Sequence, residues 1–204
     1  MKPLIERSTE IAYRTDFALL CNARGYKDAV EVGVDIGVFA KDFMTRFNGN
    51  WLFLVDPYEP AEEFPHDRMM DAMLAAQAMA AFHGRVRFIR GRSPDVIPFV
   101  VSLVTPEFAY IDGAHDHSSV LRDLQGWWDA LPDHGMLAGH DYDDAHPGVV
   151  EAVNIFAARR GRVVRITRET ACPPSWYIYK TEPPTLHQRL FLDAEIDNDR
   201  AVRA

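Results

Sequence analysis

The sequence predicts an α/β fold, in which helices cover both faces of a doubly wound, mostly parallel sheet. Strand-like and helix-like segments alternate along most of the chain. The strand-like runs are short and almost entirely apolar, as at 51–55, which is typical of strands buried on both faces. The last two such runs, at 162–167 and 175–180, are close enough in sequence to close the sheet as an antiparallel hairpin.

The individual elements follow from hydrophobic period and from turn residues. Strands are expected at 29–33, 51–55, 86–90, 107–112 and 135–140. Helices are expected at 8–24, 37–47, 67–82, 117–130 and 147–159, with a short helix or loop at 94–102. The expected buried side chains on these helices are Met69, Met70, Met73 and Met79, as core or as a lid over a pocket, and Trp127 and Trp128 as core.

The length and composition fit a single domain. With 204 residues, of which 48% are hydrophobic, the chain can bury a sizeable core. We expect a helical cap over 1–24, a ligand-binding core over 25–180 and a peripheral tail over 181–204. The tail is a candidate contact for a homodimer.

The net charge of −8 and the pI near 5.4 argue against a general nucleic-acid surface. No stretch reaches 18 uncharged apolar residues and no export signal is apparent, so we expect a cytoplasmic protein without membrane contact. Cys21 and Cys172 are far apart in sequence, and they form neither a disulfide framework nor a zinc-ligand pattern.

The run A-V-E-V-G-V-D-I-G-V-F-A at 29–40 predicts a strand, a tight turn and a helix start. Gly33 and Gly37 allow the backbone to bend sharply and to approach a ligand, while the free amides of the new helix face the same place. Glu31 and Asp35 would repel a pyrophosphate, and an acid at the strand end better suits a ligand that carries an amine. A turn with a purely structural role is the alternative.

Asp56 ends the next strand, 23 residues after Gly33. In doubly wound folds, an acid at about this distance binds the ribose hydroxyls of an adenosine group. The alternative is an ordinary turn acid before Pro57.

A second group of polar residues follows two later strands. Asp112 ends one strand, and the adjacent pair His140 and Asp141 ends the next. At the shared carboxyl edge of a sheet, two carboxylates and an imidazole could bind one divalent cation, Mg or Mn for an oxygen-rich set, whereas His140 favours Mn, Fe or Zn. The alternative is that Asp112 and Asp141 cap helices.

With these motifs the chain resembles the class I S-adenosylmethionine-dependent methyltransferases, whose sheet is Rossmann-like. The resemblance covers about 25–180 and rests on E-V-G-V-x-x-G, L-V-D at 54–56, R-G-R-S at 90–93, I-D-G-x-H at 111–115 and G-H-D-Y at 139–142. Within the class, the last two signatures resemble metal-dependent small-molecule O-methyltransferases.

The resemblance implies a role for each motif. Glu31 and the turn from Gly33 to Gly37 would hold the methionine part of S-adenosylmethionine, Asp56 its ribose, and Ser93 would lie beside its adenine. Asp112 would lie where cofactor and metal meet. The implied metal ligands are Asp112, His140 and Asp141, although relatives usually carry an acid where this chain has His140.

The implied reaction is displacement of the sulfonium methyl by an acceptor hydroxyl, in which the protein positions the two groups and removes a proton. His115 lies where catechol-type relatives place a basic lysine, so it is the candidate general base, with His117 and His146 as weaker candidates. The acceptor is expected to contact the N-terminal helix, the loop 57–68 with Tyr58, Phe64 and His66, and the segment 142–147.

Two other function classes use the same features. A nicotinamide-dependent oxidoreductase would use the glycine turn and Asp56, but the second glycine at position 35 and a recognisable proton relay are missing. A metal-dependent hydroxylase or hydrolase would use Asp112, His140 and Asp141, and a binding protein without catalysis could share the fold.

Overall fold

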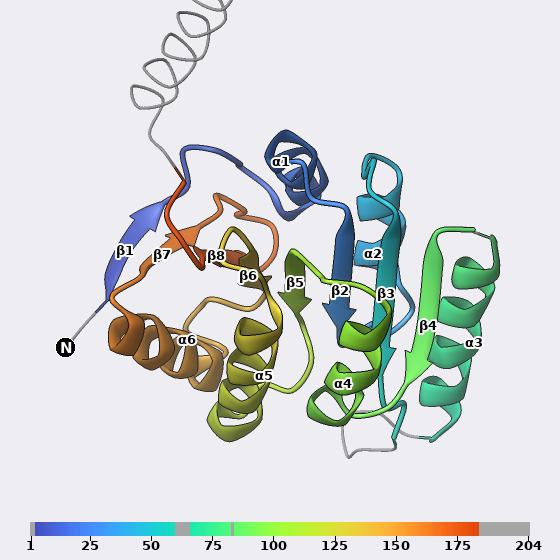
Figure 1. Cartoon of the computed structure of the whole chain (residues 1–204). Helices are drawn as coiled ribbons and strands as arrows, with labels where there is room; N and C mark the ends of the chain where they lie inside the picture. The colour runs from blue at the N-terminus through green and yellow to red at the C-terminus, as the bar shows by residue number, and fades with distance from the viewer. Residues whose placement is uncertain (1–2, 60–65, 83, 184–204) are drawn as a thin grey trace, which may run out of the picture.

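The computed structural model describes residues 3–59, 66–82 and 84–183. Its centre is an eight-stranded sheet with the order β1-β7-β8-β6-β5-β2-β3-β4 (Figure 1). The strands are β1 (Leu4–Arg7), β2 (Asp28–Val32), β3 (Trp51–Asp56), β4 (Val86–Arg90), β5 (Phe108–Ile111), β6 (Met136–Gly139), β7 (Val163–Ile166) and β8 (Trp176–Tyr179). Strand β8 runs antiparallel to β6 and β7, and all other pairs are parallel. The predicted mostly parallel sheet with a closing hairpin is confirmed.

Helices lie on both faces of this sheet, as predicted. They are α1 (Phe17–Arg24), α2 (Val38–Met44), α3 (His66–Phe82), α4 (Ser93–Leu103), α5 (His117–Ala130) and α6 (Pro147–Arg160), with a short 3-10 turn, η1, at Arg14–Asp16. Alternate residues of β3 belong to different cores: Leu52 and Leu54 pack with α1, α2 and α3, whereas Phe53 and Val55 pack with α4, α5 and α6. The sheet therefore separates two hydrophobic layers.

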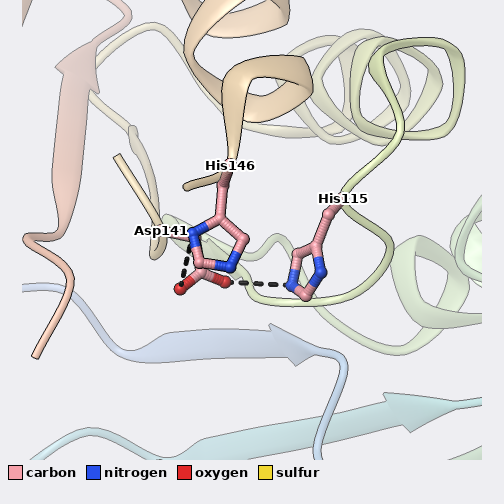
Figure 2. Close-up of side chains that lie close together, drawn as sticks. All are labelled: His115, Asp141 and His146. Carbon is pink, nitrogen blue, oxygen red and sulfur yellow. Dashed lines mark ion pairs between the residues drawn. The ribbon is translucent and has the colours of Figure 1, made fainter. Parts of the chain in front are cut away.

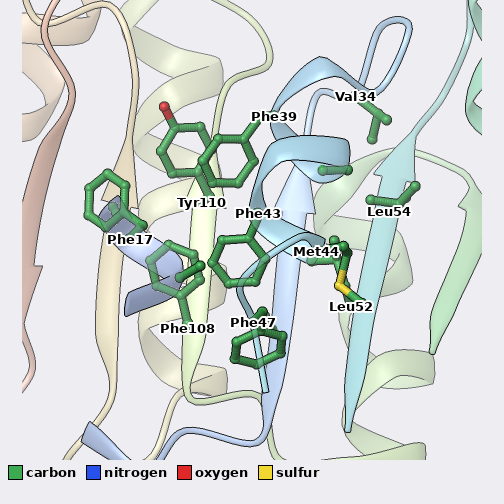
Figure 3. Close-up of a cluster of buried hydrophobic side chains, with 14 of the residues drawn as sticks. Phe17, Val34, Phe39, Phe43, Met44, Phe47, Leu52, Leu54, Phe108 and Tyr110 are labelled. Carbon is green, nitrogen blue, oxygen red and sulfur yellow. The ribbon is translucent and has the colours of Figure 1, made fainter. Parts of the chain in front are cut away.

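Aromatic rings fill the layer under α1 and α2 (Figure 3). Phe39 stacks on Tyr110 at 3.9 Å between ring centroids, and Phe43 stacks on Phe108 at 5.5 Å. These contacts fix α2 against β5, and with it the turn that precedes α2. In the opposite layer Trp127 and Trp128 are buried, which confirms their expected core role.

The methionines of α3 also belong to the core. Met69 and Met73 are buried, and Met70 and Met79 pack against the same cluster. Their spacing on the helix thus reflects packing, although Met69 also lines a cavity described below.

The predicted helix over 8–24, and with it a wholly helical cap over 1–24, is wrong in its first part. Residues 4–7 form the edge strand β1, and helical structure begins only at Arg14. The Ser8 hydroxyl accepts hydrogen bonds from the amides of Glu10 and Ile11 and contacts the Tyr177 hydroxyl at 2.8 Å. Such side-chain bonds to the local backbone compete with a helix, and here contacts distant in sequence reinforce them.

The remaining elements end within a few residues of their expected bounds, and the uncertain segment 94–102 is the helix α4. The tail beyond Pro183, with its expected homodimer contact, and Phe64 of the predicted acceptor loop lie outside the described residues. None of the helices in the described ranges combines the length and the apolar character needed to cross a membrane.

Candidate active site

The carboxyl ends of β2, β3, β5 and β6 meet at one edge of the sheet, as the parallel register requires. A cavity of about 740 Å³ opens there. The predicted site residues that line it are Gly33, Asp56, Ser93, Asp112 and His115. Glu31, Gly37, His140 and Asp141 are absent from its described lining. The structure therefore brings together residues from four separate motifs in one cavity.

The glycine turn after β2 has the conformation that the sequence indicates. Gly33 and Gly37 have φ values of +80° and +79°, in the left-handed region that favours glycine. A Cβ atom on Gly33 would lie 2.1 Å from the carbonyl oxygen of Asp112, so only glycine lets β2 end this close to the loop after β5. This contact fixes the glycine turn after β2 against the loop that carries His115.

Asp56 holds the same turn from the neighbouring strand. Its Oδ2 accepts a hydrogen bond from the amide of Val34 at 2.8 Å, and its Oδ1 accepts one from the amide of Tyr58 at 2.8 Å. The Tyr58 hydroxyl in turn donates to the carbonyl of Asp35 at 2.7 Å. Asp56 thus organises the cavity wall, and the residue itself is part of the cavity lining.

Glu31 is a buried acid whose carboxylate is not fully hydrogen-bonded by the described residues. Its side chain is 1% exposed, and Oε2 has no hydrogen-bond partner within the described residues. Burial, followed by the nearby charges of Asp112 and Asp56, raises the pKa of Glu31 well above its ordinary value, while Arg14 acts in the opposite direction. A cationic or hydrogen-bond-donating ligand group would relieve this cost.

One wall of the cavity contains a group of polar side chains that contact one another. The Trp127 indole Nε1 donates to the Ser93 hydroxyl at 2.8 Å, and both Ser93 and Asp123 line the cavity. Burial raises the pKa of Asp123 to about 6, although a hydrogen bond with Ser93 opposes this. Sequence reasoning missed Asp123, yet a signal was present, because an acid stands on the buried stripe of α5 formed by Val120, Leu124 and Trp127.

Asp112, His140 and Asp141 also come together. His140 Nδ1 lies 2.9 Å from Asp141 Oδ1 and 3.7 Å from Asp112 Oδ1, and one ligand atom from each of the three residues can lie within 4.8 Å of the others. Burial raises the pKa of Asp112 to about 6, with His140 opposing and Asp141 adding to the shift. The donor set of two carboxylates and one imidazole fits a divalent cation such as Mn²⁺.

Asp141 occupies the centre of a larger cluster of histidines. His115 Nε2 lies 3.0 Å from Asp141 Oδ2, and His146 Nδ1 lies 3.8 Å from Asp141 Oδ1 (Figure 2). Burial alone would raise the pKa of Asp141, but hydrogen bonds from His115 and His140 lower it below its ordinary range. Asp141 also has a φ of +60°, a conformation that Asp tolerates better than most residues.

Of the weaker histidine candidates, His146 therefore joins the site through Asp141. His117 begins α5, and its Nε2 is buried without a hydrogen-bond partner in the described part of the chain. In the predicted acceptor loop, Tyr58 and the neighbouring residue Glu59 line the cavity.

A family model described as a methyltransferase domain matches residues 30–142, a span that includes both groups of site residues. The chain belongs to this methyltransferase family. The cofactor that this family implies is S-adenosylmethionine. No curated protein sequence matches this methyltransferase.

Solved structures share the fold of the methyltransferase at low sequence identity. The O-methyltransferase NovP is 15% identical with a TM-score of 0.60, and the match covers 83% of this chain and 78% of NovP. CalS11, a TDP-rhamnose 3'-O-methyltransferase of calicheamicin biosynthesis, is 13% identical with a TM-score of 0.56, over 81% and 76% of the two chains. An rRNA methylase from Streptococcus thermophilus is 15% identical with a TM-score of 0.54, over 77% and 88%. These likenesses show the fold and leave the acceptor open.

Proposed function

We propose that the methyltransferase transfers the methyl group of S-adenosylmethionine to a hydroxyl oxygen of a small-molecule acceptor, assisted by a divalent cation. The observation that carries this proposal is that Gly33, Asp56, Asp112 and His115 all line one cavity. A cofactor and an acceptor held in one cavity would lie close enough to react.

The cofactor half of the proposal rests on Glu31, Asp56 and Ser93. When bound, S-adenosylmethionine supplies an electrophilic methyl group. Oε2 of Glu31, which has no hydrogen-bond partner among the described residues, suits the ammonium group of its methionine part, beside the turn from Gly33 to Gly37. Asp56 would accept hydrogen bonds from ribose hydroxyls in addition to the backbone amides that it already holds, and Ser93 would lie beside the adenine.

The acceptor half rests on the pair formed by His115 and Asp141. The carboxylate of Asp141 orients the His115 ring, and an imidazole held in this way can take the proton of an acceptor hydroxyl. His115 has 43% of its side chain exposed and lines the cavity, so an acceptor can reach it. Asp112, His140 and Asp141 would hold a cation that polarises the same hydroxyl.

Two further observations support a small hydroxylated acceptor. The net charge of −8 opposes binding of RNA, although an rRNA methylase shares the fold. NovP and CalS11, which share the fold as well, are O-methyltransferases. The identity of the acceptor, the homodimer and the cytoplasmic location stay predictions.

The test is an acceptor screen with the full chain after chelator treatment. Phenolic and sugar hydroxyl compounds are incubated with S-adenosylmethionine, with and without Mg²⁺ or Mn²⁺, and S-adenosylhomocysteine and methyl ethers are measured by mass spectrometry. We expect acceptor-dependent product that increases with the cation and falls in a His115→Ala variant. Methylation of nitrogen or of RNA instead would contradict the proposal, and turnover indifferent to chelator would remove the cation from it.

A further inference from the structure

We propose that His115, Asp141 and His146 form a binding site for one divalent transition-metal ion, such as Zn²⁺ or Co²⁺. This site is distinct from the set of Asp112, His140 and Asp141, with which it shares only Asp141. It does not rest on the proposed methyl transfer, because ion binding is measurable without cofactor or acceptor.

The three side chains come from three different segments that meet at the sheet edge (Figure 2). His115 lies in the loop between β5 and α5, Asp141 follows β6, and His146 is the residue before α6. One ligand atom from each lies within 4.8 Å of the others, and the two imidazole rings are 4.8 Å apart between centroids. Three donors at such distances can share one ion without large movement.

A glycine makes this convergence possible. A Cβ atom on Gly148 would lie 2.4 Å from the carbonyl oxygen of His115, so the first turn of α6 packs directly on the loop after β5. Gly148 is two residues from His146, and the close approach of the two backbones therefore sets the distance between the histidines.

The His146 ring also has the partner that metal-bound histidines usually have. Its Nδ1 lies 2.8 Å from Asp143 Oδ1. When Nδ1 donates its proton to Asp143, the lone pair is on Nε2 and is available to an ion. Carboxylates that orient a histidine in this way are characteristic of metal sites, and their loss typically lowers metal affinity by about 10–100-fold.

The donor chemistry selects the kind of ion. Two imidazoles and one carboxylate favour Zn²⁺, Fe²⁺ or Co²⁺, whereas Mg²⁺ prefers a set made of oxygen atoms. Three protein ligands leave at least one coordination position open. Because His115 also lines the cavity of about 740 Å³, the ion lies at the rim of that cavity.

Nε2 of His115 is the nitrogen that faces Asp141, so a general base on this ring acts through Nδ1, whereas the ion binds at Nε2. Because an ion at Nε2 would change the basicity of the same ring, activity is an unsuitable readout. We compare ion binding directly in variants of the two candidate metal sets.

The experiment titrates the chelator-stripped full chain with Zn²⁺ and Mg²⁺ by calorimetry, and with Co²⁺ by visible absorption. We compare the unaltered protein with His115→Ala, His146→Ala, Asp143→Asn and Asp112→Asn. The matched control is His134→Ala. His134 is an exposed histidine that pairs with Glu107 and precedes β6, whereas Asp141 follows that strand. Circular dichroism and thermal unfolding check the fold of each variant, and His146→Gln replaces His146→Ala if the latter does not fold.

We expect one equivalent of Zn²⁺ to bind far more tightly than Mg²⁺, with a Co²⁺ spectrum characteristic of nitrogen ligands. His115→Ala and His146→Ala should each weaken Zn²⁺ binding by more than about tenfold, and Asp143→Asn by a smaller factor. His134→Ala and Asp112→Asn should leave it within about threefold. No stoichiometric binding, or affinity lost in Asp112→Asn and kept in the histidine variants, would overturn the proposal.

Discussion

Glu31 and Asp141 are both buried carboxylates at the carboxyl edge of the sheet, but the protein surrounds them differently. Glu31 Oε2 has no partner within the described residues, and burial raises the pKa of the side chain. Asp141 has histidines at both oxygens, and their hydrogen bonds lower its pKa against the effect of burial. Ionisation of Glu31 therefore costs free energy unless a ligand provides a positive group. The neighbouring histidines, in contrast, stabilise the ionised form of Asp141.

We propose that this difference separates two ends of the site, at residues that lie next to the cavity and outside its described lining. Glu31 would interact with a cationic cofactor group, and Asp141 would orient a base or hold a cation. Gly33, which packs on the backbone of Asp112, connects the two ends. Four predictions test this division, from the largest expected effect to the smallest.

Replacing Asp141 by Asn should have the largest effect, on turnover. Without its carboxylate, His115 loses the partner that orients it, and we expect kcat to fall by about 10²–10⁴-fold while S-adenosylhomocysteine affinity is kept. Asp144→Asn, an exposed acid three residues away, serves as the control. Equal losses of turnover and of cofactor affinity would show that the two ends are not separate.

Replacing Glu31 by Gln should act on cofactor binding instead. A hydrogen bond between charged groups contributes about 1.5–3 kcal/mol, so S-adenosylmethionine affinity should fall by about 10–150-fold. Calorimetric titration measures this, with Glu151→Gln on the exposed side of α6 as control. Affinity within twofold of the unaltered protein would remove Glu31 from the cofactor site.

Replacing Asp56 by Ala should weaken cofactor binding by about 1–3 kcal/mol. Part of this loss would come from ribose contacts and part from the turn, because the amides of Val34 and Tyr58 lose their acceptor. Thermal unfolding of the cofactor-free protein separates the two contributions, and Asp42→Ala on α2 is the control. Unchanged binding would contradict the assigned role.

The two acids should also give opposite dependences of stability on pH. The raised pKa of Glu31 means that its contribution is present at low pH and is lost as pH rises from about 4.3 through the folded value. The lowered pKa of Asp141 means that its contribution is present above about 3.9 and is lost as pH falls through the folded value.

Urea unfolding from about pH 2 to about pH 8 measures these slopes, each at most about 1.4 kcal/mol per pH unit for one group. The free energy of unfolding should decline less above about pH 5 in Glu31→Gln than in the unaltered protein. Asp112, with its pKa raised to about 6, contributes to this decline in the same direction. Asp141→Asn should flatten the acid limb instead. Identical slopes in the unaltered protein and in Glu31→Gln would show that Glu31 ionises freely.

The sequence predicts the parts of this molecule that depend on local pattern. Strand β4 and helix α5 have the predicted bounds, and Glu31 and Asp56 lie at the carboxyl ends of the strands that the apolar runs indicate. The irregular segment 8–13 could not be predicted, because Ser8 forms its contacts with Tyr177, 169 residues away. The contact between His146 and Asp141 could not be predicted either, since it depends on the approach of α6 to the loop after β5 at Gly148. Local pattern specifies strands and their ends, whereas packing between distant segments decides which side chains meet.

The most direct test of the cofactor site is calorimetric titration of the chelator-stripped protein and of Glu31→Gln with S-adenosylmethionine, S-adenosylhomocysteine and NAD. We predict that the unaltered protein binds both sulfur compounds and not NAD, and that Glu31→Gln loses most of that affinity. Binding of NAD alone, or equal binding of the sulfur compounds by both proteins, would contradict the account of Glu31 and of the glycine turn beside it.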